Sequence, residues 1–184
     1  STFYDACIIL GSYRFWKSVA IEPFSWLPFI NAEKNGGISD VKTAISKGKL
    51  TGPLSTTVLL EMLLKHDPAQ AVKLAEKMVE EYPECRLFAW QLGEGYWKME
   101  RFTDAVRVFS GIADSMSQNE TDDGSAKLRC WWKLAVLSKS VGKTSECLHY
   151  CNKVIEIGKR ESVNKKQKKI IDKAQRLIDE IIDG

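Results

Sequence analysis

Residues 89–96, Ala-Trp-Gln-Leu-Gly-Glu-Gly-Tyr, and residues 102–109, Phe-Thr-Asp-Ala-Val-Arg-Val-Phe, decide the fold of this chain. Gly93 and Ala105 are the small residues of the two stretches, and large apolar residues stand three or four positions away from them, which is typical of two packed helices. Ala71 lies 34 residues before Ala105, in a similar segment that ends at Pro83. A repeat of this length, built from two amphipathic helices, predicts stacked helical hairpins in an all-α solenoid.

The repeat continues on the carboxyl side of these stretches. A third unit reproduces the pattern at an offset of 42 residues, because a polar, turn-forming insertion, Gln118–Ser125, lengthens the second unit. We therefore place hairpin units at 52–85, 86–127 and 128–160, with Asp67 and Pro68 as the N-cap and first-turn proline of one helix. The residues expected at packed positions are Val58, Leu59, Met62, Ala71, Ala75 and Met78; Ala89, Leu92, Gly93, Tyr96, Phe102, Ala105, Phe109 and Ile112; and Trp131, Leu134, Ala135, Gly142, Cys147, Cys151 and Val154.

Both ends of the chain extend this pattern into a single domain over 1–184. Residues 1–51 predict a divergent first hairpin, whose second helix runs from about Ile38 to Gly48 after a turn at Asn35-Gly36-Gly37. An apolar connection, Ile21–Ile30, joins its two helices. Residues 161–184 predict an amphipathic helix that covers the last hairpin, since a solenoid needs a capping element.

The spacing and residue types over most of the chain from Gly52 onward resemble the tetratricopeptide repeat (TPR) superfamily, most specifically Leu92-Gly93, Tyr96, Ala105 and Phe109. The opening residues Asp5–Tyr13, the Leu-Pro-Phe loop and Gly37-Ile38 are more weakly similar to the inclusion-body-clearance and tetratricopeptide-39-like branch and its bacterial relatives. The resemblance implies an adaptor or scaffold and provides no catalytic residues.

In this superfamily the first helix of each hairpin lines a peptide groove, which gives candidate contact residues here. They are Leu87, Trp90, Glu94, Trp97 and Lys98 of the second unit and Arg129, Trp132 and Lys139 of the third. Tryptophan and arginine often anchor interfaces. We hypothesise that Trp90 and Trp132 bind an extended or acidic segment of another protein. The alternative is that both pack against neighbouring hairpins or against a terminal segment beyond this sequence. Glu94 would repel a carboxylate, which argues against a clamp for a terminal carboxyl group.

A second hypothesis concerns a membrane surface. The aromatic residues Phe24, Trp26 and Phe29 of the apolar connection, with the lysine-rich final helix, would suit a peripheral membrane or lipid-associated adaptor. The same aromatics, with Phe15 and Trp16, would also suit a dimer interface, contact with an N-terminal part of the same chain beyond this sequence, or burial within the chain.

Composition narrows the classes of function, partner and compartment that the sequence allows. The chain has 184 residues, and its net charge of +3 is too small to indicate a nucleic-acid partner. Five cysteines at helical positions favour buried thiols in a reducing, cytoplasmic compartment over disulfides. The chain starts without Met inside a helix-like segment, and we expect it to be a fragment. His66 and His149 have no partner at a recognisable catalytic or metal-binding spacing, so we expect a non-enzymatic protein without metal or cofactor.

Overall fold

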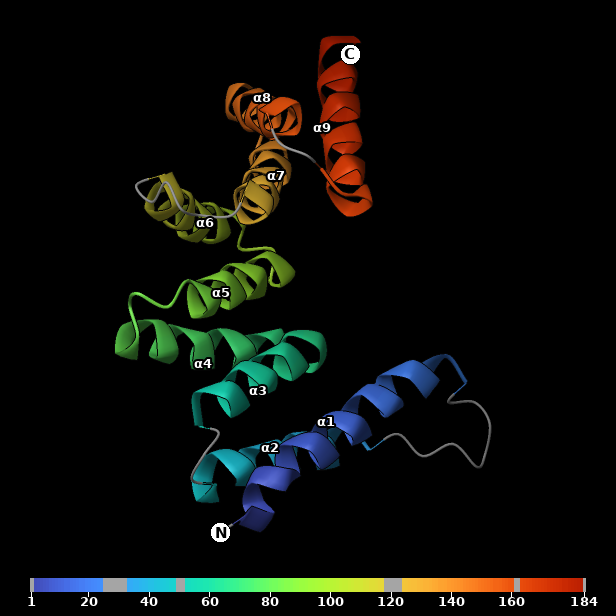
Figure 1. Cartoon of the computed structure of the whole chain (residues 1–184), viewed down its shortest axis with the longest axis vertical. Helices are drawn as coiled ribbons and strands as arrows, with labels where there is room; N and C mark the ends of the chain where they lie inside the picture. Colours follow the sequence, from blue (N-terminus) through green and yellow to red (C-terminus); the bar gives the residue numbers. More distant parts are fainter. Residues whose placement is uncertain (1, 25–32, 49–51, 118–123, 161–162, 184) are drawn as a thin grey trace. The chain divides into compact units, whose positions relative to one another are not determined.

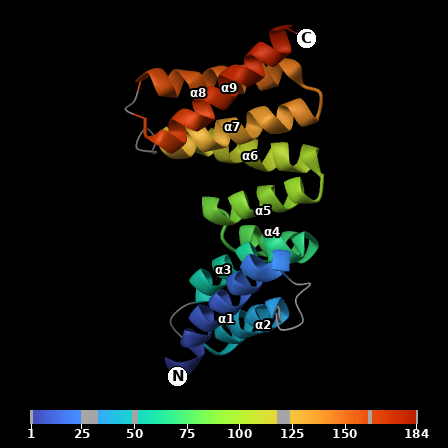
Figure 2. The same ribbon diagram turned by 90° about the vertical axis from the view of Figure 1, so that its right-hand side faces the viewer.

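The computed structural model describes residues 2–24, 33–48, 52–117, 124–160 and 163–183, and these residues are almost entirely α-helical (Figures 1 and 2). The predicted all-α fold is confirmed. By its internal contacts the chain divides into two compact units, unit 1 over Ser1–Pro83 and unit 2 over Glu84–Gly184. Each unit has its own hydrophobic core.

Unit 1 is built from α1 (Thr2–Ile21), the short 3₁₀ helix η1 (Glu22–Phe24), α2 (Lys34–Lys47), α3 (Gly52–His66) and α4 (Pro68–Glu81). Successive helices pack side by side, and α1 also reaches α3. Their shared core contains Phe15, Ile38, Val41, Leu59, Met62, Leu63, Leu64 and Ala71. As predicted, Asp67 caps α4: its Oδ1 accepts a hydrogen bond of 3.1 Å from the backbone N–H of Gln70.

Two glycines let α1 and α2 approach backbone to backbone. A Cβ atom on Gly37 would lie 2.6 Å from the carbonyl oxygen of Gly11, and one on Gly11 would lie 2.6 Å from the carbonyl oxygen of Gly37. The prediction of a turn at Asn35-Gly36-Gly37 was wrong, because α2 already begins at Lys34. Gly37 serves close helix packing here, which overrides the turn preference of the Gly-Gly pair.

Unit 2 is built from α5 (Arg86–Lys98), α6 (Phe102–Ser117), α7 (Gly124–Ser140), α8 (Thr144–Arg160) and α9 (Lys165–Asp183). Successive helices again pack together, and α9 contacts both α8 and α7. The core between α7, α8 and α9 contains Leu128, Ala135, Cys147, Cys151, Val154, Ile157, Ala174 and Leu177. Asn164 starts α9 by accepting hydrogen bonds from the backbone N–H groups of Lys166 and Gln167, while Gln167 Oε1 accepts one from the N–H of Asn164.

The turns after α5 and α7 share one hydrogen-bond pattern at an offset of 42 residues. After α5, the N–H groups of Glu100 and Arg101 donate to the carbonyls of Trp97 and Tyr96; after α7, those of Gly142 and Lys143 donate to the carbonyls of Lys139 and Ser138. Both turns place one residue in the left-handed region, Glu100 at φ 58° and Gly142 at φ 75°. This is the Schellman ending of a helix, and it occurs at the offset that the repeat predicted.

Substitutions at the positive-φ residues of the two turns should change stability in opposite directions. Glutamate carries the steric cost of a positive φ that glycine avoids, so Glu100→Gly should raise the free energy of unfolding of unit 2 by about 0.5–1 kcal/mol. Gly142→Ala should lower it by about 1 kcal/mol for the same reason. Urea unfolding followed by tryptophan fluorescence measures both variants. Changes in the same direction would contradict the shared role of the two positions.

Candidate functional site

The candidate site lies on α5 and α7 of unit 2. Helix α5 is fixed through buried Phe88, Leu92 and Tyr96, and Gly93 allows close contact because a Cβ there would meet the Phe109 ring of α6 at 2.7 Å. Helix α7 is fixed through buried Leu128, Leu134, Ala135 and Leu137. These buried stripes determine which side chains of α5 and α7 remain at the surface.

Trp90 is anchored on one side and accessible on the other. Its ring lies edge to face against buried Phe109, with 5.0 Å between the ring centroids. The guanidinium carbon of Arg129 on α7 lies 5.9 Å from the Trp90 ring centroid, within the range of a cation–π interaction. Trp90 is therefore half-buried, and Arg129, itself exposed, extends this cationic and aromatic surface from α5 to α7.

A second contact between a cation and an aromatic ring lies further along α5 and α7. Lys133 Nζ on α7 is 3.5 Å from the Trp97 ring centroid and 2.8 Å from Glu94 Oε1. The side chains of Lys133 and Glu94 are only 18% and 23% exposed. Burial lowers the pKa of Lys133, and the hydrogen bond to Glu94 counters that effect. Lys133 was not among the candidate residues predicted from the sequence. The available signal was a cation on one predicted first helix and Glu94 on the other.

The other groove residues predicted from the sequence lie in different surroundings. Trp132 is half-buried and packs against the core of α7, α8 and α9. Lys139 pairs with Glu180 of α9 at 2.9 Å, and this hydrogen bond raises the pKa of Lys139. Leu87 and Lys98 are exposed on α5. The structure thus brings Trp90, Glu94 and Trp97 of α5 together with α7 through Arg129 and Lys133.

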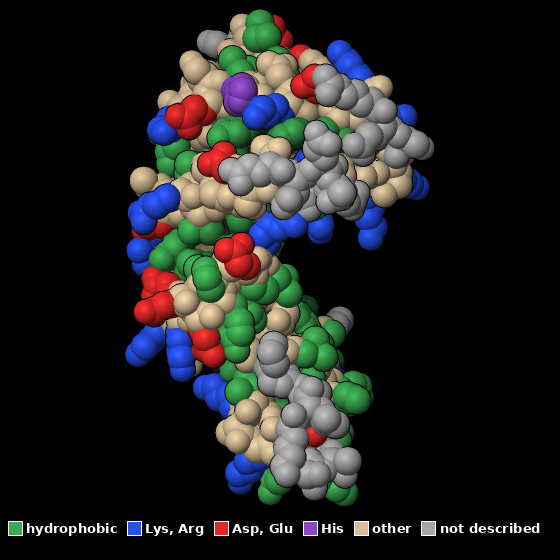
Figure 3. Space-filling view, turned by 60° about the vertical axis from the view of Figure 1, so that its left-hand side comes forward, with side chains coloured by type: hydrophobic (Ala, Val, Ile, Leu, Met, Phe, Trp, Pro, Cys, Tyr) green, Lys and Arg blue, Asp and Glu red, His purple; other side chains and the backbone are tan. Residues whose placement is uncertain are grey.

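The aromatic residues near the start of the chain have separate positions. Phe15 is completely buried in the core of unit 1, and Trp16 is exposed on α1. The backbone of Phe24 belongs to η1, whereas its side chain and the predicted loop residues Trp26 and Phe29 lie outside the described residues. Hydrophobic side chains at the surface are visible between charged ones in Figure 3. On α1 the exposed large apolar side chains are Phe3, Tyr4, Ile9, Leu10, Tyr13 and Trp16.

The five cysteines are free thiols with two kinds of surroundings. Cys130, Cys147 and Cys151 are fully buried, while Cys7 and Cys85 are half-buried. Burial raises the pKa of Cys130 and of Cys151 to about 12, and it also raises the pKa of Cys147. No group of three or more His, Cys, Asp or Glu side chains suited to a metal ion occurs within the described part of the chain.

This difference predicts the thiol reactivity of the folded protein. At pH 8 a thiol of pKa about 12 is ionised in roughly one molecule in ten thousand, and the thiolate is the reactive form. Ellman's reagent should therefore titrate Cys7 and Cys85 in the native protein and the other three cysteines only after denaturant is added. Rapid native labelling of Cys130 or Cys151, located by peptide mass mapping, would contradict the buried arrangement.

No protein-family model matches this chain, and no curated protein is similar to it. Among the described residues, no helix has the length and apolar character needed to cross a membrane.

Proposed function

We propose that this chain is a non-catalytic adaptor with a TPR-like solenoid fold, and that unit 2 binds a segment of another protein on the α5–α7 face. The observation that carries the proposal is the pairing of accessible tryptophan with cations across two helices, Trp90 with Arg129 and Trp97 with Lys133. Flat aromatic and guanidinium groups bury large areas at low entropic cost, so they are effective anchors for a partner. The matching turns after α5 and α7 support the repeat architecture.

The chemistry of this face favours an extended segment with acidic residues. Glu94 is neutralised by Lys133, and within the described residues Lys98 has no ion-pair partner. The guanidinium carbon of Arg129 lies 5.9 Å from the Trp90 ring centroid, and Arg129 forms no ion pair with any residue that the structure describes. The uncompensated charge of the face is therefore positive, and complementary charge on the partner would speed association and fix its register.

The test uses exposed residues that do not support the core. Because Trp90 packs on Phe109, Trp90→Ala would confuse loss of binding with loss of structure. We expect Lys98→Glu/Arg129→Glu to lose a partner that wild type captures from lysate of the source cells, with affinity for that partner, once identified, reduced at least about tenfold. The matched control Lys159→Glu/Lys169→Glu changes equal charge on α8 and α9. Equal capture by all three proteins would refute the proposed face.

A second candidate is a peripheral membrane adaptor, favoured by the exposed apolar side chains along α1. Phe3, Ile9 and Tyr13 would insert into a lipid surface together with the apolar segment that follows α1 in the sequence. Co-sedimentation with anionic vesicles at low salt, lost in Trp26→Ser/Phe29→Ser, is the expected result for this candidate. Failure of wild type to sediment would exclude it.

A further inference from the structure

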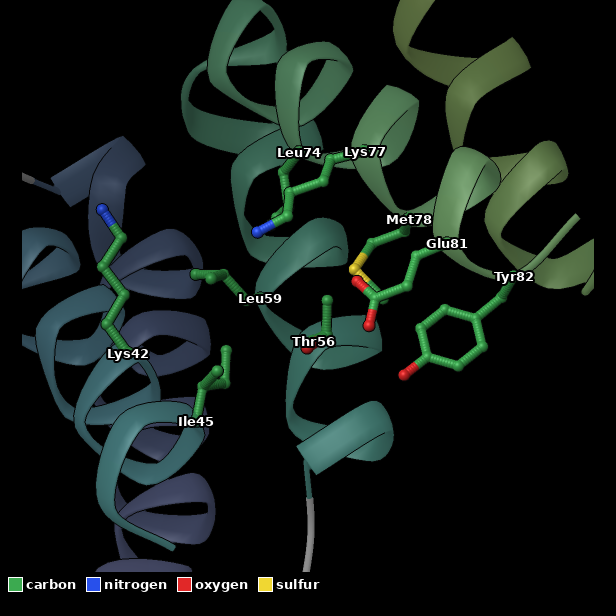
Figure 4. A pocket seen from close by; sticks show the side chains of 9 residues that line it. All are labelled: Lys42, Ile45, Thr56, Leu59, Leu74, Lys77, Met78, Glu81 and Tyr82. Atoms are coloured by element: carbon green, nitrogen blue, oxygen red, sulfur yellow. The ribbon is translucent and has the colours of Figure 1, made fainter.

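Unit 1 contains a cavity of about 360 Å³ between α2, α3 and α4, and none of its lining residues belongs to α5 or α7. Figure 4 shows Ile45 of α2 and Leu74 and Met78 of α4 on either side of Leu59, which rises from α3 between them. These aliphatic side chains form an apolar floor. A cavity of this size holds one or two side chains of a bound molecule.

The rim of the cavity is cationic. Lys42 from α2 and Lys77 from α4 both line it, and both are exposed (Figure 4). Within the described residues neither lysine has an ion pair or a hydrogen bond. Glu81 also lines the cavity, but it accepts the hydrogen bond of the Tyr82 hydroxyl, which raises the pKa of Tyr82. The two lysines outnumber this one carboxylate, so the net charge of the described lining is positive.

A second cavity of about 280 Å³ adjoins the first and shares Lys42 with it. Polar side chains line much of this part, including Asn35, Ser39 and Gln70, above Ile38 and Leu63. From Asn35 to Ile45, α2 rises by about 15 Å. An extended peptide covers that distance with about five residues.

We propose that this groove, defined by the two cavities along α2 and α4, binds an extended peptide in which an apolar residue is flanked by aspartate or glutamate. The apolar side chain enters the floor of Ile45, Leu59 and Met78. The neighbouring carboxylates pair with Lys42 and Lys77. The peptide backbone then passes the polar half of the groove, where Asn35 Oδ1 is already hydrogen-bonded to His66 and Gln70 Nε2 to Asp67. The Asn35 side-chain N–H groups, Gln70 Oε1 and the Ser39 hydroxyl offer hydrogen bonds to that backbone.

The same features separate a peptide from other anionic ligands. An acyl chain with a carboxylate would use the apolar floor but has no groups for the polar half of the groove. A nucleic acid needs flat aromatic surfaces for its bases, whereas the described lining has only Tyr82 in the first cavity and His66 in the second. Only a peptide has an apolar side chain, carboxylates and regularly spaced backbone groups together.

The experiment uses the full chain and a fluorescein-labelled peptide with one central leucine flanked on each side by two aspartates, read by fluorescence anisotropy. We expect saturable binding that weakens about tenfold or more in Lys42→Glu/Lys77→Glu. The control Lys17→Glu/Lys65→Glu reverses equal charge on α1 and α3 at residues that line neither cavity, and should bind like wild type. Replacement of the aspartates with asparagine in the peptide should also weaken binding at least about tenfold.

Three results would overturn the proposal. The first is equal peptide affinity of wild type and Lys42→Glu/Lys77→Glu, with circular dichroism showing both folded. The second is that peptide binding weakens as much in the control variant as in Lys42→Glu/Lys77→Glu. The third is displacement of the peptide by decanoate at matched concentration, which would indicate an acyl ligand. The variant Lys98→Glu/Arg129→Glu should keep full affinity for the peptide. That result would show that the peptide does not bind at the α5–α7 face. The proposal for the groove and the proposal for the α5–α7 face can therefore be refuted independently.

Discussion

Gly37→Ala should lower the free energy of unfolding of unit 1 by about 2–3 kcal/mol, although alanine is the better helix former. The added Cβ would lie 2.6 Å from the backbone oxygen of Gly11 and 2.9 Å from Phe15, which is completely buried. A side chain could rotate away from such a contact, but a helix backbone cannot. The contact is relieved only if α1 and α2 separate, and separation gives up packing around Phe15 and Val41.

The neighbouring residue provides the control for this prediction. Among the described residues, a Cβ on Gly36 would meet only the Glu33 Cβ, at 3.8 Å. Gly36→Ala in the same helix should therefore leave stability unchanged or raise it by up to about 1 kcal/mol. Urea unfolding by circular dichroism gives the free energies, and hydrogen exchange of α1 and α2 amides assigns the change to unit 1. A Gly37→Ala protein as stable as wild type would show that the two helices do not need this close approach.

Glu94→Leu and Lys133→Met should each destabilise unit 2 by about 2 kcal/mol, whereas the double variant should cost much less than the sum. Each single change leaves one charge in a position that is less than a quarter exposed and deprives it of its 2.8 Å partner. The double change leaves no charge behind. Methionine also keeps an unbranched side chain over the Trp97 ring, where Lys133 lies in wild type.

An exposed pair provides the comparison cycle. Lys139 and Glu180 are also in contact, at 2.9 Å, but their side chains are 51% and 63% exposed. Solvent screens such a pair, so Lys139→Met and Glu180→Leu should show a coupling below about 1 kcal/mol. Urea unfolding followed by fluorescence, to which Trp90, Trp97, Trp131 and Trp132 of unit 2 contribute, measures both cycles. A coupling between Glu94 and Lys133 no larger than that of the exposed pair would show that their burial is unimportant.

Sequence spacing predicted the packed positions of the helices well. Ala71, Ala75, Ala105 and Phe109 are all buried, and Gly142 forms the turn at which α7 ends. These positions follow from local rules, because a helix presents its third and fourth neighbours on one face and small residues permit close contact. Asn35-Gly36-Gly37 was misread because its local turn preference yields to a contact with Gly11, 26 residues away from Gly37 in the sequence.

The candidate site was less predictable, since it depends on how far side chains reach between helices. Repeat positions selected Trp90 and Trp97 but not Lys133, whose contact with both Glu94 and Trp97 depends on the separation of α5 from α7. Lys139 was selected as a groove residue, and its pairing with Glu180 depends on where α9 packs. The cavity between α2 and α4 has no sequence motif, because its lining residues come from three helices and meet only after folding.

The contact between Gly11 and Gly37 also bears on how distant relatives of this chain are to be recognised. Phe15 follows Gly11 by four residues and Val41 follows Gly37 by four, and both side chains are completely buried. As homologous sequences diverge, surface positions of α1 and α2 can change freely, whereas a substitution at either glycine drives the hairpin apart. We therefore expect homologues that keep this hairpin to retain both glycines and the large apolar residue four positions after each of them.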